Sequence, residues 1–254
     1  KAFAKDTNFK YSKNEIFNYF SGIVSLNQNY TTAGFKYLNK IQKPKDHFNY
    51  NVQFLRSLIM LNKFEQAFDF SKSIWKEDVY FFDVDLILGL NFFVNKDYVK
   101  AQKHFERLNK TSNYNLIFDD FFGNVLISWI KAAQGNKEES FKYSNKVPKH
   151  FDTLKRIQNN FLQCYFNTPE AFTELANDKK NNFNRYNFFL ADYLVSKNKK
   201  SEAEQLINKT LKLNKSNLLI KQLGESIQNK NNNIYNFFSC DEPRDSIAEI
   251  FYVI

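Results

Sequence analysis

Apolar residues recur at three- and four-residue steps along most of this chain, and short polar turns interrupt them at regular intervals. Residues 81–109 show the pattern most clearly. An apolar segment ends at a polar Asn-Lys-Asp turn, and Tyr98, Ala101, Phe105 and Leu108 then mark one face of the segment that follows. Steps of three and four residues place side chains on one face of an α-helix. The pattern therefore predicts a pair of short amphipathic helices joined by a tight turn.

Two kinds of position return at an interval of 34 residues. Aromatic residues hold one position and alanines hold another, three residues later: Tyr30, Phe64 and Tyr98, then Ala33, Ala67 and Ala101. A small residue is needed where two helices cross closely, and a large residue stands four positions after it at Tyr37 and Phe105. A fixed period of this length indicates one helix–turn–helix unit stacked on copies of itself.

These positions resemble the tetratricopeptide repeat (TPR), which is a helix–turn–helix unit of the same length. Leu88-Gly89 in the third unit matches the Leu-Gly pair of that repeat's first helix, and the first two units lack the pair. The closing proline of the repeat has a counterpart only at Pro44. In general character the chain is similar to TPR-containing proteins of alphaproteobacteria. The resemblance implies a bacterial repeat protein that presents a surface to a partner.

The rest of the chain fits the same unit with looser spacing, with Ser140, Ala171 and Ala203 at the small position. We expect an all-α fold, a right-handed α-solenoid that forms a single domain and contains about six TPR-like units and C-terminal capping helices. The domain and its parts are expected at 1–254, with units near 14–43, 48–77, 81–109, 116–147, 151–177 and 184–213, a cap at 217–229 and the start of a further helix at 245–254.

The end of the chain is less regular. Pro243 is expected to interrupt the chain, and Asp245 or Ser246 then caps the last helix. That helix is still apolar at Ile254, and the chain starts with Lys1. We therefore expect the sequence to be part of a longer protein.

Composition supports short turns and long helices, because the chain has only 6 Gly and 4 Pro. Phe alone contributes 29 residues, and Asn and Lys are also abundant. This bias indicates an AT-rich genome, so it is not evidence of aromatic recognition. Cys164 and Cys240 lie far apart in sequence and are expected to be unpaired core residues.

The net charge of +9 is unevenly distributed. Residues 179–230 contain eleven Lys or Arg and four acids. Such a stretch can bind anionic lipid, nucleic acid or an acidic protein, but it can also be a solvated outer face in a lysine-rich protein. Arg, which recognises phosphates and bases bidentately, is nearly absent from it. The candidate basic patch consists of Lys197, Lys199, Lys200, Lys209, Lys212 and Lys215.

No pattern of residues indicates catalysis. His47, His104 and His150 have no second His or Cys at a metal-ligand spacing, and we expect all three at the surface. A Gly-rich phosphate loop and a nucleophile elbow are both missing. The acid pair Asp83/Asp85 could do acid–base work if it were buried in a cleft, but we expect it to have no catalytic role. We therefore expect no enzyme, no catalytic residue, no metal, no cofactor and no small-molecule substrate.

The resemblance to TPR proteins implies that the first helices of successive units line a concave groove that binds the partner. Arg156 and Asn160 match the first pair of the family's carboxylate clamp, but Phe189 stands where an Asn is needed, so a clamp is not expected. Trp129 either faces the groove as an anchor or packs between units as core. The candidate groove residues are Asn18, Arg56, Asp83, Trp129, Arg156, Asn160, Arg185 and Asp192.

Two functions remain open at this point. The first is a noncatalytic scaffold that binds a protein or peptide in the groove of the TPR solenoid. The alternative is an accessory factor that docks on an anionic membrane or on nucleic acid through the basic 179–230 face. Resemblance to exported repeat proteins implies the bacterial cell envelope or periplasm as the location.

Overall fold

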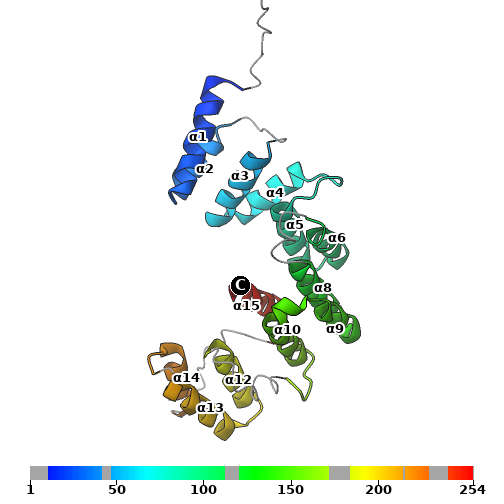
Figure 1. Cartoon of the computed structure of the whole chain (residues 1–254), viewed down its shortest axis with the longest axis vertical. Coiled ribbons are helices and arrows are strands. Elements are labelled where there is room, and N and C mark those ends of the chain that lie inside the picture. Colours follow the sequence, from blue (N-terminus) through cyan, green and yellow to red (C-terminus); the bar gives the residue numbers. More distant parts are fainter. Residues whose placement is uncertain are drawn as a thin grey trace, which may run out of the picture. The chain divides into compact units, whose positions relative to one another are not determined.

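The structure is a computed structural model, and it describes residues 11–41, 47–111, 120–171, 184–213, 215–228 and 240–253 (Figure 1). These residues form thirteen α-helices and one short 3-10 helix, with no strand among them, which confirms the all-α fold class. The chain divides into two compact units, residues 1–123 and 124–254. A single continuous domain over 1–254 stays a prediction. Parts of the ranges expected at 14–43, 116–147, 151–177, 217–229 and 245–254 lie outside the described residues.

The N-terminal unit is a series of helix pairs in which each helix packs on the next. Its helices are α1 (Lys13–Asn27), α2 (Thr31–Leu38), α3 (Phe48–Met60), α4 (Phe64–Ile74), α5 (Phe82–Val94) and α6 (Tyr98–Leu108). Helix α8 (Phe121–Ala133) begins at the end of this unit. Helix α1 also contacts α3, so the first helices of the first two pairs are neighbours.

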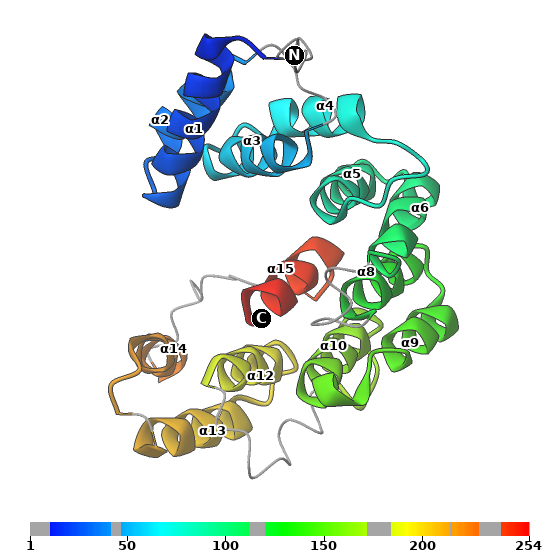
Figure 2. The same ribbon diagram turned by 45° about the horizontal axis from the view of Figure 1, so that its top comes forward.

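The C-terminal unit continues the alternation and then turns back on itself. It contains α9 (Lys137–Asn145), the 3-10 helix η1 (Lys149–Phe151), α10 (Asp152–Tyr165), α12 (Asn184–Ser196), α13 (Lys200–Leu213), α14 (Leu218–Gln228) and α15 (Pro243–Val253). Helix α14 packs on both α12 and α13, and α15 packs on α10 (Figure 2). Pro243 does not interrupt the chain as expected. It is the first residue of α15, where a missing N–H costs nothing.

One turn is repeated throughout the described chain and defines the units. A residue with positive φ follows each first helix, and these residues are Asn29, Asn62, Lys96, Gly135, Asn167 and Asn198. After each one, the next N–H donates to the carbonyl five residues back, as from Tyr30 to Ser25 at 2.8 Å. This is the Schellman motif, which satisfies the last carbonyls of the helix. Its six copies support about six helix–turn–helix units.

In the first helix–turn–helix unit, the small position and the large position each come one residue later than the 34-residue interval predicts. Its small residue is Gly34 and its large residue is Leu38, both buried, whereas Ala33 and Tyr37 are half-buried. A Cβ added at Gly34 would lie 2.5 Å from the Leu26 side chain, so the close crossing of α1 and α2 needs glycine. Small buried residues follow the turn by five positions in four of the other units, at Ala67, Ala101, Ser140 and Ala203.

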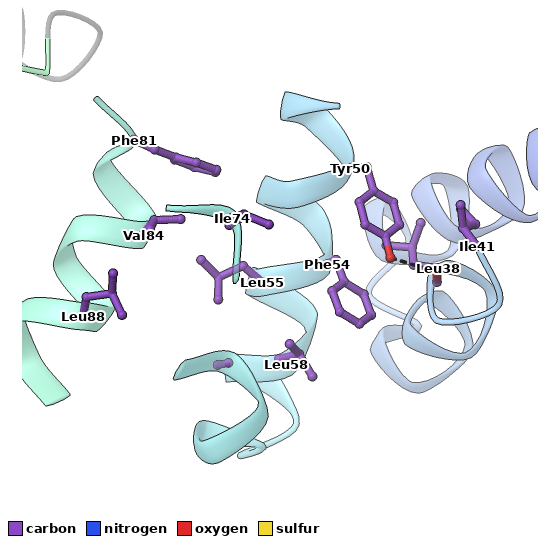
Figure 3. Close-up of a cluster of buried hydrophobic side chains, with 11 residues drawn as sticks. Leu38, Ile41, Tyr50, Phe54, Leu55, Leu58, Ile74, Phe81, Val84 and Leu88 are labelled. Atoms are coloured by element: carbon purple, nitrogen blue, oxygen red, sulfur yellow. Dashed lines mark hydrogen bonds between the residues drawn. The ribbon is translucent and has the colours of Figure 1, made fainter. Parts of the chain in front are cut away.

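A continuous apolar core runs through the N-terminal unit between α2, α3, α4 and α5 (Figure 3). It consists of Leu38, Ile41, Tyr50, Phe54, Leu55, Leu58, Ala67, Ile74, Phe81, Val84 and Leu88. The Tyr50 hydroxyl donates to the Leu38 carbonyl at 3.2 Å, and burial raises the pKa of Tyr50 to about 12. This core fixes α1, α3 and α5 relative to one another, so their outer faces form a defined surface.

The prediction that the two cysteines are unpaired is wrong. Cys164, near the end of α10, forms a disulfide with Cys240, and their Cα atoms are 5.6 Å apart. The pair is 76 positions apart in sequence, and the return of α15 onto α10 brings the two residues together. The disulfide therefore fastens the last described helix to the middle of the C-terminal unit.

Candidate functional site

Helix α1 carries an exposed apolar face, which we call the α1 stripe. It consists of Ile16, Phe17, Phe20 and Val24, and all four side chains are exposed. Their spacing of one, three and four residues places them on adjacent positions of one helix face. The opposite face of α1 is the packed one, because Gly22 contacts Leu38 of α2. The stripe is thus the outer surface of a helix that the core already holds in place.

A small pocket of about 70 Å³ lies beside the stripe. Its lining comes from Tyr11, Glu15, Ile16, Tyr19, Phe20, Ile41 and His47. The His47 Nδ1 accepts a hydrogen bond from the Tyr50 backbone N–H at 3.1 Å and so caps α3. The His47 ring also packs against Tyr19, with ring centroids 5.0 Å apart. The pocket is therefore a largely apolar recess in a rigid wall, of a size that suits part of one side chain.

Apolar exposure in this unit is concentrated on the first helices. Seven of the fourteen exposed large apolar side chains in the described residues lie on α1, α3 and α5, and two lie on α4 and α6. The seven are Ile16, Phe17, Phe20, Val24, Phe48, Met60 and Val94. Scattered exposed apolar residues are normal, but the four on α1 are adjacent to one another, and a contiguous exposed apolar patch indicates an interaction site.

The candidate groove residues of this unit lie on the same three helices. Arg56 of α3 and Asp83 of α5 form an ion pair, with 3.2 Å between Arg56 Nε and Asp83 Oδ1. Asn18 of α1 is half-buried. The structure thus brings two of the three into contact across neighbouring units. The pair is a polar contact between α3 and α5.

A buried polar cluster around Asp85 was not predicted. Asp85 is fully buried, and its Oδ1 accepts from Trp75 Nε1 at 3.0 Å and from Arg107 Nε at 2.9 Å. His104 Nδ1 lies 2.8 Å from the same oxygen. The expectation that His104 is at the surface is therefore wrong, because it is buried between the rings of Trp75 and Phe92. The cluster links α5, α6 and the residue that follows α4.

Trp129 belongs to the core and not to a groove. Its side chain is fully buried, and its Nε1 donates to Gln158 Oε1 at 2.9 Å. Gln158 Nε2 donates in turn to Ser128 Oγ at 2.5 Å. A partner cannot contact an indole enclosed in this way. Of the two interpretations that the sequence left open, the structure agrees with the one in which Trp129 packs as core.

The remaining candidate groove residues lie on α10 and α12. Asn160 is buried, and its Nδ2 donates to the Arg156 carbonyl at 2.7 Å, so it cannot serve as an exposed clamp residue. Arg156 Nε lies 3.4 Å from Asp152 Oδ2. Asp192 is half-buried, and burial raises its pKa. The Arg185 side chain lies outside the described residues.

The candidate basic patch separates into two groups. Lys199 and Lys200, at the start of α13, pair with Glu202 and Glu204 at 3.4 and 4.0 Å. Lys197 donates to Asn167. The second group, toward the end of α13 and beyond, comprises Lys209, Lys212 and Lys215, which are exposed and form no ion pair among the described residues.

The described residues contain no cluster of three or more His, Cys, Asp or Glu side chains that could hold a metal ion. None of the helices described is both long and apolar enough to cross a membrane.

No family model and no curated protein sequence matches the chain. Among solved structures, it is similar to the apo form of RapI, with 15% identity and a TM-score of 0.46 over 96% of this chain and 87% of that one. It is also similar to aspartyl phosphate phosphatase F from Bacillus subtilis, with 13% identity and a TM-score of 0.40 over 94% of this chain and 59% of that one. At this distance neither protein's role transfers to this chain.

Proposed function

We propose that this protein is a noncatalytic scaffold that binds a protein or peptide partner on the first-helix face of its N-terminal unit. The α1 stripe and the pocket beside it form the apolar centre of the binding surface. The ion pair between Arg56 and Asp83 lies on the neighbouring first helices and supplies polar selectivity. An apolar centre with a polar surround is the usual composition of a protein interface.

The observation that carries the proposal is the α1 stripe itself. If a partner removed these four exposed apolar side chains from water, the burial of each one would favour binding. Because the core already holds α1 in place, binding requires little further ordering of this helix. A rigid surface loses less entropy on association. The partner we expect is a helix or extended segment that inserts one apolar side chain into the pocket.

A location in the cell envelope fits the same proposal. Disulfides form and persist in oxidising compartments and are rare where thiols are kept reduced. The bond between Cys164 and Cys240 supports a bacterial envelope or periplasmic location for the scaffold.

Site-directed photo-cross-linking in the native cells tests this proposal. A photoreactive amino acid replaces Phe20, and a matched control replaces Phe64 of α4. The two phenylalanines are equally exposed, at 61% and 58%, but only Phe20 is part of the stripe. We expect a discrete cross-linked partner from position 20 and none from position 64. Cross-links from position 20 only within the same chain would contradict the proposal, because the stripe would then be covered internally.

A further inference from the structure

The turn between α13 and α14 combines exposed leucines with unpaired lysines. Leu213 is the last residue of α13 and is 61% exposed, and Leu218 is the first residue of α14 and is 71% exposed. Both helices are held by the core of their unit, through buried Ile207 and Ile220. Two large apolar side chains therefore project from the end of a packed helical hairpin, where neither contributes to the core.

Each leucine has a lysine beside it on the same face of its helix. Lys209 precedes Leu213 by four residues, and Lys221 follows Leu218 by three, which makes each a neighbour on its helix surface. Lys212 and Lys215 lie in and after the last turn of α13. We call these four lysines and two leucines the basic turn. Residues 205–224 contain the four lysines and no Asp or Glu.

Within the part of the chain that the structure describes, the four lysines of the basic turn form no ion pair. The start of the same helix differs, because Lys199 and Lys200 have acidic partners there. The four lysines of the basic turn are exposed, so their positive charge is available to a partner at the surface. A partner that is both anionic and apolar would interact favourably with the lysines and the leucines together.

We propose that the basic turn docks on an anionic lipid surface, with Leu213 and Leu218 inserted at the boundary between headgroups and acyl chains. The four lysines bind the headgroup phosphates. Interfacial attachment of this kind depends on apolar insertion together with electrostatic attraction. It requires no membrane-spanning helix. The proposal is independent of the protein-binding surface on α1, which belongs to the other unit.

The same residues fit nucleic acid less well. Strands of nucleic acid are bound by aromatic side chains that stack on bases and by arginines that contact bases and phosphates, and residues 205–224 contain neither. Exposed leucines gain nothing on a phosphate backbone. They do gain from entry into the acyl region of a bilayer.

Vesicle flotation of the full chain tests the proposal. Vesicles of phosphatidylcholine alone are compared with vesicles in which a third of the lipid is phosphatidylglycerol. We expect binding only to the anionic vesicles. Replacement of Lys212 and Lys215 by Gln should weaken it by about 25-fold, since a lysine near such a surface contributes about a factor of five. The variant Leu213→Ser/Leu218→Ser should weaken it by about 100-fold, since burial of one leucine contributes about a factor of ten.

The matched control is Lys199→Gln/Lys200→Gln, which removes the same charge from the other end of α13 and should leave vesicle binding nearly unchanged. Circular dichroism verifies that every variant is folded. Equal binding by Leu213→Ser/Leu218→Ser and the parent would overturn the insertion. No vesicle binding, with or without retention of an oligonucleotide or an acidic peptide, would overturn the proposal. Phe20→Ser should not affect vesicle binding, so failure here is separable from failure of the protein-binding surface.

Discussion

Replacement of Asp85 by Ala should be among the most damaging single changes in the N-terminal unit. One buried oxygen of Asp85 accepts from Trp75 and Arg107 and contacts His104, and three segments of the unit meet there. Without the carboxylate, the Arg107 guanidinium remains buried without its counter-ion. Loss of one partner of a buried ion pair costs about 3–5 kcal/mol.

The lower end of that range is expected, because Arg107 keeps three backbone acceptors. Its guanidinium donates to the carbonyls of Lys76, Glu77 and Val79, which hold the loop before α5. A loss of about 3 kcal/mol corresponds to a fall in Tm of about 6–12 °C for a chain of this size. The loop and the start of α5 should open first, since Arg107 links both to α6.

Asp83→Ala is the matched control. Asp83 and Asp85 both lie in the first turn of α5, so both substitutions lose the same favourable interaction with the helix dipole. Asp83, however, pairs with an exposed Arg56, and such a pair contributes about 0–1 kcal/mol. Urea unfolding followed by Trp75 fluorescence, in a Trp129→Phe background, reports the stability of this unit. A difference of less than about 1 kcal/mol between the two variants would refute the role assigned to the Asp85 cluster.

Three further predictions concern the turns and the C-terminal unit. Lys96 has a φ of 62°, where Asn is tolerated better than Lys, so Lys96→Asn should raise stability by about 0.5–1 kcal/mol in urea unfolding; no gain would contradict the assigned backbone geometry. Cys164→Ser/Cys240→Ser should lower stability by about 2–4 kcal/mol, and unchanged unfolding under oxidising conditions would argue against the disulfide. Burial raises the pKa of Asp192, so the folded chain holds that proton more tightly than the unfolded chain, and stability falls as pH rises through the aspartate range. Asp192→Asn should therefore raise Tm at neutral pH, with a gain that shrinks toward acid pH, and a constant gain would contradict this account.

The sequence predicts the helix pairs well because their cause is local. Apolar periodicity and a small residue at the close crossing both act within one unit, and Ala67, Ala101 and Ala203 are buried as that logic requires. The one-residue error in the first unit arose because Ala33 lies beside the true small position, Gly34. A search for the turn residue would have avoided it, since Asn occupies four of the six left-handed positions.

Residues whose partners come from distant segments could not be predicted in this way. His104 was expected at the surface, but it contacts Asp85, which lies on α5, and Arg107 reaches the same carboxylate from α6. The disulfide likewise depends on the return of α15 to α10. Trp129 could not be assigned until its partner, Gln158, was placed beside it.

The most direct test of the central claim is the affinity of the cross-linked partner, once purified, for the parent and for two single variants. Phe20→Ser removes an exposed ring from the α1 stripe, and Phe64→Ser removes an equally exposed ring from α4. Burial of a phenylalanine is worth about 1.5–3 kcal/mol, so titration calorimetry should show Phe20→Ser binding about 10–100-fold more weakly. Phe64→Ser should bind as the parent does. Equal affinities for all three proteins would contradict the claim that the first-helix face binds the partner.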